Sequence, residues 1–306
     1  MRLVFAGTPD AAVPSLQVLA ASAHDVVDVI TRTDAPVGRK RVLTPSPVAI
    51  AAEQLGLTVH RTDRLDDAAT ARIEGLRPDL GVIVAYGALV REPLLSTPRH
   101  GWINLHFSLL PAWRGAAPVQ RALMAGERET GADVFQLVAG LDAGDVLGQV
   151  RYRVPPLATA DRVLTDLAQE GAGLLLRVVD EIAAGTAVAV AQTGEPSYAH
   201  KLTAEDGRLD WTASAEEIVA RWQGTTPEPG AFTTLDSQRV KVLELRPGDT
   251  AVTLRPGALV SEGRRVLVGT ATEPLEIVRV QPAGRGAMSA ADWFRGLRTT
   301  DPAVGS

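Results

Sequence analysis

Cysteine is absent from this chain of 306 residues, and that absence removes several kinds of chemistry. Without thiols the protein has no disulfide, no thiolate nucleophile and no cysteine zinc site. The five histidines form no close pair and show no His-x-x-x-His ligand spacing. We therefore expect no metal dependence, although sites made of carboxylates alone stay open.

Long apolar segments are also lacking. No stretch approaches the length of a transmembrane helix, and Met1–Gly7 enters a short apolar strand pattern without the longer apolar core and cleavage site of a signal peptide. The chain is 45% hydrophobic and 22% charged, as is typical of globular proteins, and is long enough for two domains. We expect a cytoplasmic protein without membrane contact.

Basic residues are not in excess, because the formal net charge is −5. Residues 208–306 hold 12 Lys and Arg and 12 Asp and Glu. Residues 1–207 therefore hold 19 Lys and Arg (31 − 12) and 24 Asp and Glu (36 − 12). This balance gives no support for nucleic-acid binding, which depends on cations that meet phosphates.

One segment, Thr31–Thr44, is locally basic. Its cations outweigh Asp34 in a loop with proline and glycine, and they are Arg32, Arg39, Lys40 and Arg41. Such short runs are often only solvated surface loops. The position of this one after the second predicted strand, at the edge where a site should open, favours contact with a substrate.

The apolar pattern predicts an α/β fold. Strand-like runs at Leu3–Ala6, Val26–Ile30, Leu80–Val84 and Trp102–Leu105 alternate with helical patterns at Val48–Leu55 and Ala68–Leu76. This order is typical of a doubly wound, mostly parallel, Rossmann-like sheet.

The pattern changes towards the carboxyl terminus. Short strand candidates with glycine and proline turns between them predict a small β-barrel, and they are Val240–Leu245, Ala258–Val260, Arg265–Gly269 and Leu275–Val280. We predict a catalytic domain at 1–188, a polar linker at 189–207 and a β-barrel domain at 208–306.

A candidate active site begins with Asn104 and His106. Side chains alternate along a strand, so these two project from one face while Leu105 and Phe107 project from the other. Pro111 has no backbone donor, so the strand should end near Ser108 and leave His106 at its carboxyl end. Open α/β sheets bind their ligands at that end.

Asp142 lies between Gly140 and Gly144, which we expect to let the backbone take tight, positive-φ shapes that could carry a carboxylate to the imidazole. An asparagine amide, a histidine and an aspartate together suit transfer of an acyl group to an amine. Taken alone, Asn-x-His is a weak signal, and an aspartate among glycines is more often an ordinary turn residue.

These residues resemble the folate-dependent formyltransferases, whose shared pattern is Asn, His, Ser-Leu-Leu-Pro and a distant Leu-Asp-x-Gly-Asp. Further matching segments lie in the same order along nearly the whole chain: Ala6–Pro9, Pro36–Arg41, Pro45–Val48, Trp113–Pro118 and Gln281–Met288. One departure is Phe107, where the family commonly has a small residue. Because Phe107 should face away from His106, we expect a change in packing and not in chemistry.

The resemblance implies transfer of a formyl group from 10-formyltetrahydrofolate to the amino group of methionyl initiator tRNA. It further implies an oligonucleotide-binding-like carboxyl domain and a monomer. Carried over by position, the catalytic set is Asn104, His106 and Asp142. The folate-contacting turn is Ser108, Leu109, Leu110 and Pro111. Candidate tRNA contacts are Arg39, Lys40, Arg41 and Lys201, with Arg285 and Arg295 as further phosphate contacts.

The expected mechanism has Asp142, or a water that it holds, take a proton from the methionyl amine. A protonated His106 and the Asn104 amide stabilise charge on the formyl oxygen, and His106 then protonates the leaving nitrogen. Two other functions remain open. Glycinamide-ribonucleotide or amino-sugar formyltransferases share the catalytic set, and a non-catalytic RNA-binding protein could keep the fold.

Overall fold

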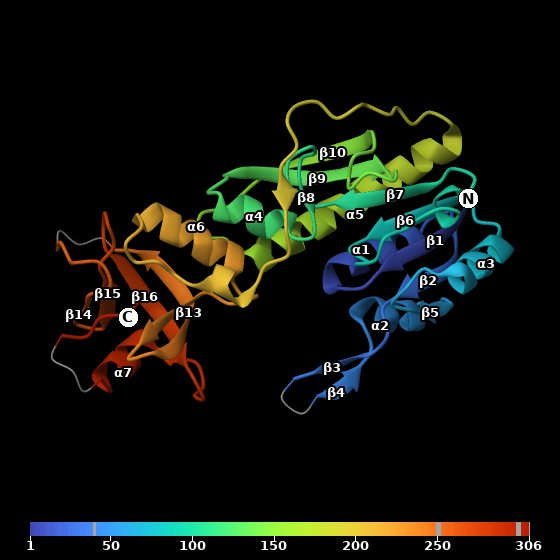
Figure 1. Ribbon diagram of the computed structural model, residues 1–306. Helices are drawn as coiled ribbons and strands as arrows, with labels where there is room; N and C mark the ends of the chain where they lie inside the picture. Colours follow the sequence, from blue (N-terminus) through green and yellow to red (C-terminus); the bar gives the residue numbers. More distant parts are fainter. Residues whose placement is uncertain (39–40, 249–251, 298–300, 306) are drawn as a thin grey trace. The chain divides into compact units, whose positions relative to one another are not determined.

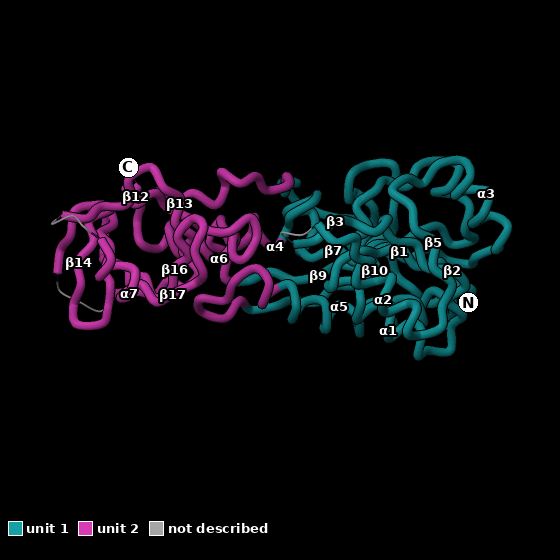
Figure 2. The backbone as a smooth tube through the Cα atoms, turned by 90° about the horizontal axis from the view of Figure 1, so that it is seen from below, with its two compact units in different colours: residues 1–118, 129–153, 164–199 teal, residues 119–128, 154–163, 200–306 magenta. Residues whose placement is uncertain are grey.

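A computed structural model describes residues 1–38, 41–248, 252–297 and 301–305. The described chain divides into two compact units, coloured in Figure 2. Unit 1 comprises Met1–Pro118, Glu129–Arg153 and Leu164–Ala199, and unit 2 comprises Val119–Arg128, Val154–Val163 and His200–Ser306. The expected domain boundaries at 188 and 208 stay a prediction.

Unit 1 is built on a seven-stranded sheet with the order β10-β9-β7-β6-β1-β2-β5 (Figure 1). The strands are β1 Arg2–Gly7, β2 Asp25–Thr31, β5 Val59–Arg61, β6 Leu80–Val84, β7 Trp102–His106, β9 Glu129–Gln136 and β10 Val146–Arg153. The first five of these pair in parallel, whereas β9 and β10 are antiparallel. The expected mostly parallel α/β sheet is confirmed.

Helices lie on both faces of this sheet. In α3 (Asp67–Leu76), Ile73 belongs to a buried cluster with Val4, Ile83 and Trp102. On the other face, Leu105 lies so close to α5 (Ala160–Ala184) that a Cβ added at Gly171 would be 3.0 Å from it. Asn104 is in register with Ile83, which belongs to the cluster on the α3 face. Because side chains alternate along a strand, Asn104 and His106 lie on that face, opposite α5.

The remaining elements that precede residue 200 are short. They are η1 Asp10–Ala12, α1 Val13–Ala20, β3 Ala35–Val37, β4 Val42–Thr44, α2 Pro47–Gln54, η2 Leu94–Ser96, β8 Arg114–Gly115, α4 Pro118–Met124 and β11 Tyr198–Ala199. Ser46 caps α2 and Asp66 caps α3, each by accepting a backbone N–H with its side chain. The strands β3 and β4 form a hairpin within the segment expected to be a basic loop.

Unit 2 holds a six-stranded sheet in which β12, β13, β16, β15 and β14 follow in that order and β17 pairs with β16. Every strand pair in it is antiparallel. The elements are η3 Ala204–Gly207, α6 Ala215–Thr225, β12 Phe232–Leu235, β13 Gln238–Pro247, β14 Leu259–Glu262, β15 Arg265–Val268, β16 Leu275–Pro282, β17 Met288–Ser289 and α7 Ala290–Arg295. Of the small β-barrel domain expected for this part of the chain, the β structure is confirmed, as a sheet of antiparallel strands.

Three buried tryptophans, Trp211, Trp222 and Trp293, contribute to the core of unit 2. Large aromatic rings provide much apolar area, and their N–H groups need partners when buried. The indole of Trp211 donates to Thr233 Oγ1 at 2.8 Å, and that of Trp222 donates to the Val242 carbonyl at 3.1 Å. These bonds anchor the turn at Trp211 to β12 and helix α6 to β13.

Among the helices of the described residues, none is long and apolar enough to cross a membrane.

Candidate active site

His106 is the last residue of β7 and is almost entirely buried, at 6% exposure. Its Nε2 is 2.9 Å from the carbonyl oxygen of Trp113. Since a carbonyl only accepts, Nε2 carries a hydrogen in this contact. The other ring nitrogen, Nδ1, lies 3.9 Å from Asp142 Oδ2. The imidazole and the carboxylate that the sequence placed in one site are therefore neighbours.

Asp142 is buried on a loop between β9 and β10, and the Gly115 N–H donates to its Oδ2 at 2.7 Å. The left-handed backbone here belongs to Asp142 itself, with φ 45°. Gly144 has a different role, because a Cβ there would lie 1.7 Å from the Gln136 carbonyl oxygen. The glycine permits close packing of the loop, and the expectation that Gly140 and Gly144 carry the positive φ is wrong.

Asn104 and His106 are two residues apart on one strand, so their side chains leave the same face about 7 Å apart. Phe135 of β9 is in register with Asn104, and its ring meets the His106 ring edge-on at 6.3 Å. Asn104 Oδ1 is buried without a hydrogen-bond partner among the described residues. Asn104 as a whole is half-buried, and a buried acceptor with an open position is suited to a ligand that brings a donor into the site.

Burial lowers the pKa of His106, opposed by the nearby Asp142 carboxylate and by the bond to the Trp113 carbonyl. The charged imidazolium is disfavoured because little water reaches the ring. The lowered pKa favours the neutral imidazole before reaction. The protonated His106 expected during formyl transfer stays a prediction. The carboxylate beside Nδ1 favours the charged form when a proton arrives during a reaction.

The turn Ser108–Pro111 follows β7 directly. Ser108 is fully buried and its hydroxyl donates to the Ala112 carbonyl at 2.6 Å. The Leu110 N–H donates to Asp133 Oδ2 at 2.7 Å. The serine hydroxyl is thus already engaged in shaping the turn. Phe107 is buried at 6% exposure, which agrees with the packing role expected for it.

The candidate tRNA contacts are only partly described. Arg39 and Lys40 lie outside the described residues. Arg41 is exposed beside β4 in unit 1, and Lys201 is exposed in unit 2. Arg32, counted with the basic segment, instead contacts Asp63 at 3.6 Å and the Gly87 carbonyl at 2.5 Å. Arg32 therefore stabilises the local fold.

Two supporting residues come from the segment expected to be only a linker. Gln192 donates from Nε2 to the carbonyls of Asp142 and Gly144, both at 2.8 Å, and accepts from Arg114 at 2.5 Å. Ser197 accepts the Trp113 N–H at 2.9 Å. The segment therefore holds the Asp142 loop and the turn whose carbonyl binds His106.

Gln192→Ala is expected to lower turnover about 10- to 100-fold, because small displacements of a catalytic group are costly. The substitution removes both donors to the Asp142 loop but leaves the carboxylate itself in place. Steady-state kinetics test this, with Gln54→Ala, an exposed glutamine of α2, as the matched control. If both variants turn over like the wild type, Gln192 does not position Asp142.

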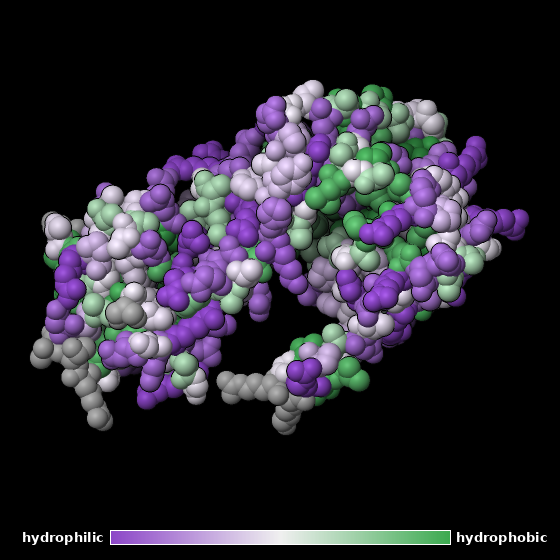
Figure 3. Space-filling model, in the orientation of Figure 1, coloured by the Kyte–Doolittle hydropathy of each residue, from purple (hydrophilic) through white to green (hydrophobic). Residues whose placement is uncertain are grey.

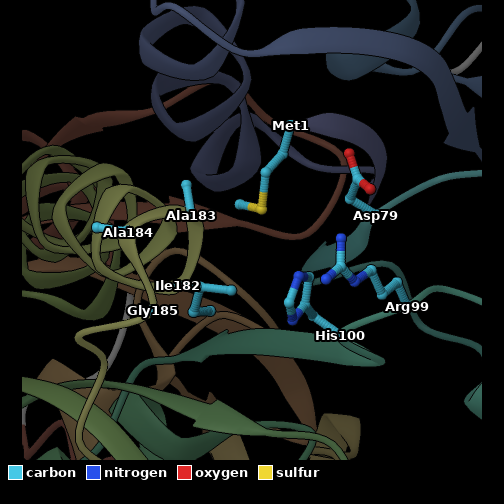
Figure 4. Close-up of a pocket in the computed structure, with 8 residues that line it drawn as sticks. All are labelled: Met1, Asp79, Arg99, His100, Ile182, Ala183, Ala184 and Gly185. Atoms are coloured by element: carbon cyan, nitrogen blue, oxygen red, sulfur yellow. The ribbon is translucent and has the colours of Figure 1, made fainter.

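A cavity of about 450 Å³ lies elsewhere in unit 1 (Figure 4). Its lining includes Asp79, Arg99 and His100, which precede β6 and β7. It therefore lies at the amino ends of these strands, away from His106. None of the candidate catalytic residues lines it.

Comparison with known proteins defines the class to which this fold and site belong. The model of the formyl transferase family matches residues 1–179, and the model of the formyl transferase C-terminal domain matches residues 201–298. Among solved structures, an N-formyltransferase from Helicobacter canadensis with folinic acid and dTDP-3-aminofucose has a TM-score of 0.69. It is 15% identical, over 92% of this chain and 98% of that one, and so it supports the fold alone.

Closer relatives narrow the class. A methionyl-tRNA formyltransferase of Clavibacter sepedonicus is 60% identical over 98% of this chain and 99% of its own length. Another of the same name, from Leifsonia xyli subsp. xyli, is 61% identical over 97% of each chain. The chain belongs to the formyltransferase family, within its methionyl-tRNA formyltransferase branch.

Proposed function

We propose that this protein transfers the formyl group of 10-formyltetrahydrofolate to the amino group of methionine carried by initiator tRNA. The observation that carries the proposal is the placement of His106 at the carboxyl end of β7, with Asn104 on the same face and Asp142 Oδ2 3.9 Å from its Nδ1. We expect it to act as a monomer in the cytoplasm.

Asp142 assists the attacking amine. An α-amino group has a pKa of about 7.7 to 8.0 in model peptides, so at neutral pH much of it is protonated and unreactive. Asp142, or a water that it holds, accepts the extra proton of the ammonium form and releases it to solvent, which leaves a neutral amine and an ionised carboxylate before the attack. The Gly115 N–H bonded to Oδ2 keeps the carboxylate oriented towards His106 while it does so.

His106 transfers a second proton. When the neutral amine attacks the formyl carbon, its nitrogen loses this proton to the imidazole, and the ionised Asp142 carboxylate stabilises the imidazolium that forms. His106 then gives this proton to N10 as the bond between N10 and the formyl carbon breaks. The amine thus exchanges one proton for the formyl group, and N10 gains one proton.

Asn104 stabilises the charge on the formyl oxygen. Its amide is a donor fixed by strand β7 in a largely water-free place, where such a hydrogen bond is much stronger than in water. The residues fit the reactants, since the Asn104 amide can donate from Nδ2 to the formyl oxygen while Oδ1, which has no hydrogen-bond partner within the described parts of the chain, can accept an N–H of the attacking amine. When bound, 10-formyltetrahydrofolate supplies the activated formyl group, and the turn Ser108–Pro111 holds it beside His106.

The hairpin β3–β4 is the proposed contact for the methionine-bearing end of the tRNA. Its basic residues Arg39, Lys40 and Arg41 can meet phosphates, and Lys201 of unit 2 is a further contact. Val37, Val42 and Leu43 are exposed on the same hairpin, at 57%, 59% and 67% (Figure 3). Exposed apolar side chains beside cations favour a surface that binds a macromolecule.

Arg39→Ala is expected to raise KM for methionyl-tRNA about 10-fold and to leave folate affinity unchanged, because a lost phosphate contact weakens tRNA alone. Initial rates against tRNA concentration, at fixed salt, measure this. Arg177→Ala is the matched control, since Arg177 is an exposed arginine of α5. An unaltered KM in Arg39→Ala removes the hairpin arginine from the tRNA site.

A side-by-side formylation assay tests the proposed function. The purified chain is given 10-formyltetrahydrofolate with methionyl initiator tRNA, glycinamide ribonucleotide or an amino sugar as acceptor. Formylation of the tRNA, with the two small acceptors slower by orders of magnitude, is expected. Preference for a small acceptor contradicts the choice of substrate, and formylation of none contradicts an enzymatic role.

A further inference from the structure

A second buried carboxylate, Asp133, lies beside the catalytic histidine. Asp133 of β9 is in register with His106 of β7, and its exposure is 0%. Residues opposite each other on paired strands project to the same face, with Cβ atoms about 5 Å apart. Asp133 therefore lies on the face that carries Asn104 and His106.

The turn Ser108–Pro111 lies over this carboxylate. Asp133 Oδ2 accepts the Leu110 N–H at 2.7 Å. Two residues earlier on the same face, a Cβ added at Gly131 would lie 2.4 Å from Leu109 Cδ2, so the turn packs directly on β9 there. The hydrogen bond between the Leu110 N–H and the carboxylate beneath it thus contributes to the position of the turn.

We propose that Asp133 is a positioning residue for the folate co-substrate, and that its ionised carboxylate holds the turn Ser108–Pro111 in the shape that binds folate. This inference rests on the proposed function, because it assigns a support to the folate turn. Asp133 acts through the Leu110 N–H and does not itself touch the reacting atoms.

The carboxylate is set to titrate close to neutral pH. Burial raises the pKa of Asp133 to about 6, against the opposing effects of the Leu110 N–H, Gln149 and Arg151. Gln149 is in register with Asp133 on β10, and His106 is in register with it on β7. The other ionisable groups around Asp133 are His106, Asp142 and Arg151.

The pH dependence of folate affinity follows from the hydrogen bond between Asp133 and the Leu110 N–H. An ionised oxygen is a stronger acceptor than a protonated one, so the turn is held most firmly above pH 6. As pH falls through about 6, Asp133 gains a proton, the bond to Leu110 weakens, and affinity for folate drops. Stability changes the opposite way, since a raised pKa means that ionisation of Asp133 costs folding free energy as pH rises through the folded-state value.

Asp133→Asn separates these effects. The variant keeps a neutral acceptor of the same shape, so tetrahydrofolate should bind about 10-fold more weakly at pH 8, which equals about 1.4 kcal/mol. Because a buried charge is removed, its thermal stability at pH 8 should equal or exceed that of the wild type. A purely structural role would instead lower the stability and leave folate affinity intact.

The test is equilibrium binding of tetrahydrofolate to the full chain at pH 8.0 and pH 5.5. One value lies above and the other below the Asp133 pKa of about 6. Wild type, His106→Ala and the control Glu74→Gln, an exposed carboxylate of α3, should each bind about 3-fold more weakly at the lower pH, because with a pKa of about 6 roughly a quarter of Asp133 stays ionised there. Asp133→Asn should be weak at both values and change little between them.

The outcomes separate the two proposals. A wild type that fails to bind tetrahydrofolate at either pH overturns the proposed function and this inference with it. Asp133→Asn that binds like the wild type at pH 8.0, or retains its pH response, overturns the inference alone. If Asp133→Asn fails to fold, the wild type and His106→Ala provide the test. The assignment to Asp133 is contradicted if folate affinity of the wild type does not change with pH, or if this change is lost in His106→Ala.

Discussion

Asn104→Ala and His106→Ala are each expected to reduce turnover by about 100- to 1000-fold, the usual cost of removing one donor to a developing oxyanion. Asn104 contributes the fixed amide and His106 the proton that N10 requires. Neither side chain belongs to the turn Ser108–Pro111, so tetrahydrofolate affinity should change far less than turnover. Single-turnover formylation with saturating tRNA measures the loss.

His100→Ala is the matched control for this pair. His100 lies two residues before the first residue of β7 and lines the cavity at the amino ends of the strands, so its removal should leave the rate unchanged. A variant of Asn104 or His106 that keeps wild-type turnover removes that residue from the mechanism. Equal losses of turnover and folate affinity would instead assign it to binding.

Asp142→Asn is expected to lower turnover by at least about 100-fold, within the range that a general acid or base contributes. The left-handed backbone at Asp142, with φ 45°, is one that asparagine tolerates well. The substituted amide keeps an oxygen for the Gly115 N–H. The substitution therefore removes the charge beside His106 with little disturbance of the loop.

Asp236→Asn provides a control with the same backbone conformation, since Asp236 has φ 49° in the turn between β12 and β13. Its turnover should equal that of the wild type. Asp142→Asn with unimpaired turnover would show that neither amine deprotonation nor imidazolium stabilisation depends on this carboxylate.

The sequence predicts the parts of the site that depend on local geometry. Alternation along a strand is a local property, so Asn104 and His106 could be assigned to one face, and Pro111 to a position beyond the strand end, without knowledge of the fold. The apolar runs likewise located the buried parallel strands. The pairing of His106 with Asp142 required the family resemblance, because no local pattern joins two distant loops.

The sequence does not reveal the supports of the site, because they depend on contacts between distant segments. Gln192 is an ordinary polar residue in a turn-rich passage, and only the folded chain brings its amide to the Asp142 loop. Asp133 interrupts an apolar strand, which signals a special position but does not identify its partner, the Leu110 N–H. Two features of the Asp142 loop likewise belong to the folded chain alone: the positive φ at Asp142, and not at its glycines, and the packing of Gly144 against Gln136.

The central claim is that His106 and Asp142 act as one unit in formyl transfer, and a double-variant cycle tests it most directly. Single-turnover rates are compared for His106→Ala, Asp142→Asn and the double variant at saturating folate and methionyl-tRNA. Groups that work together give strongly non-additive losses, so the double variant should be no more than about 10-fold slower than the slower single variant. If the two losses multiply in full, the residues act independently and the proposed mechanism is wrong.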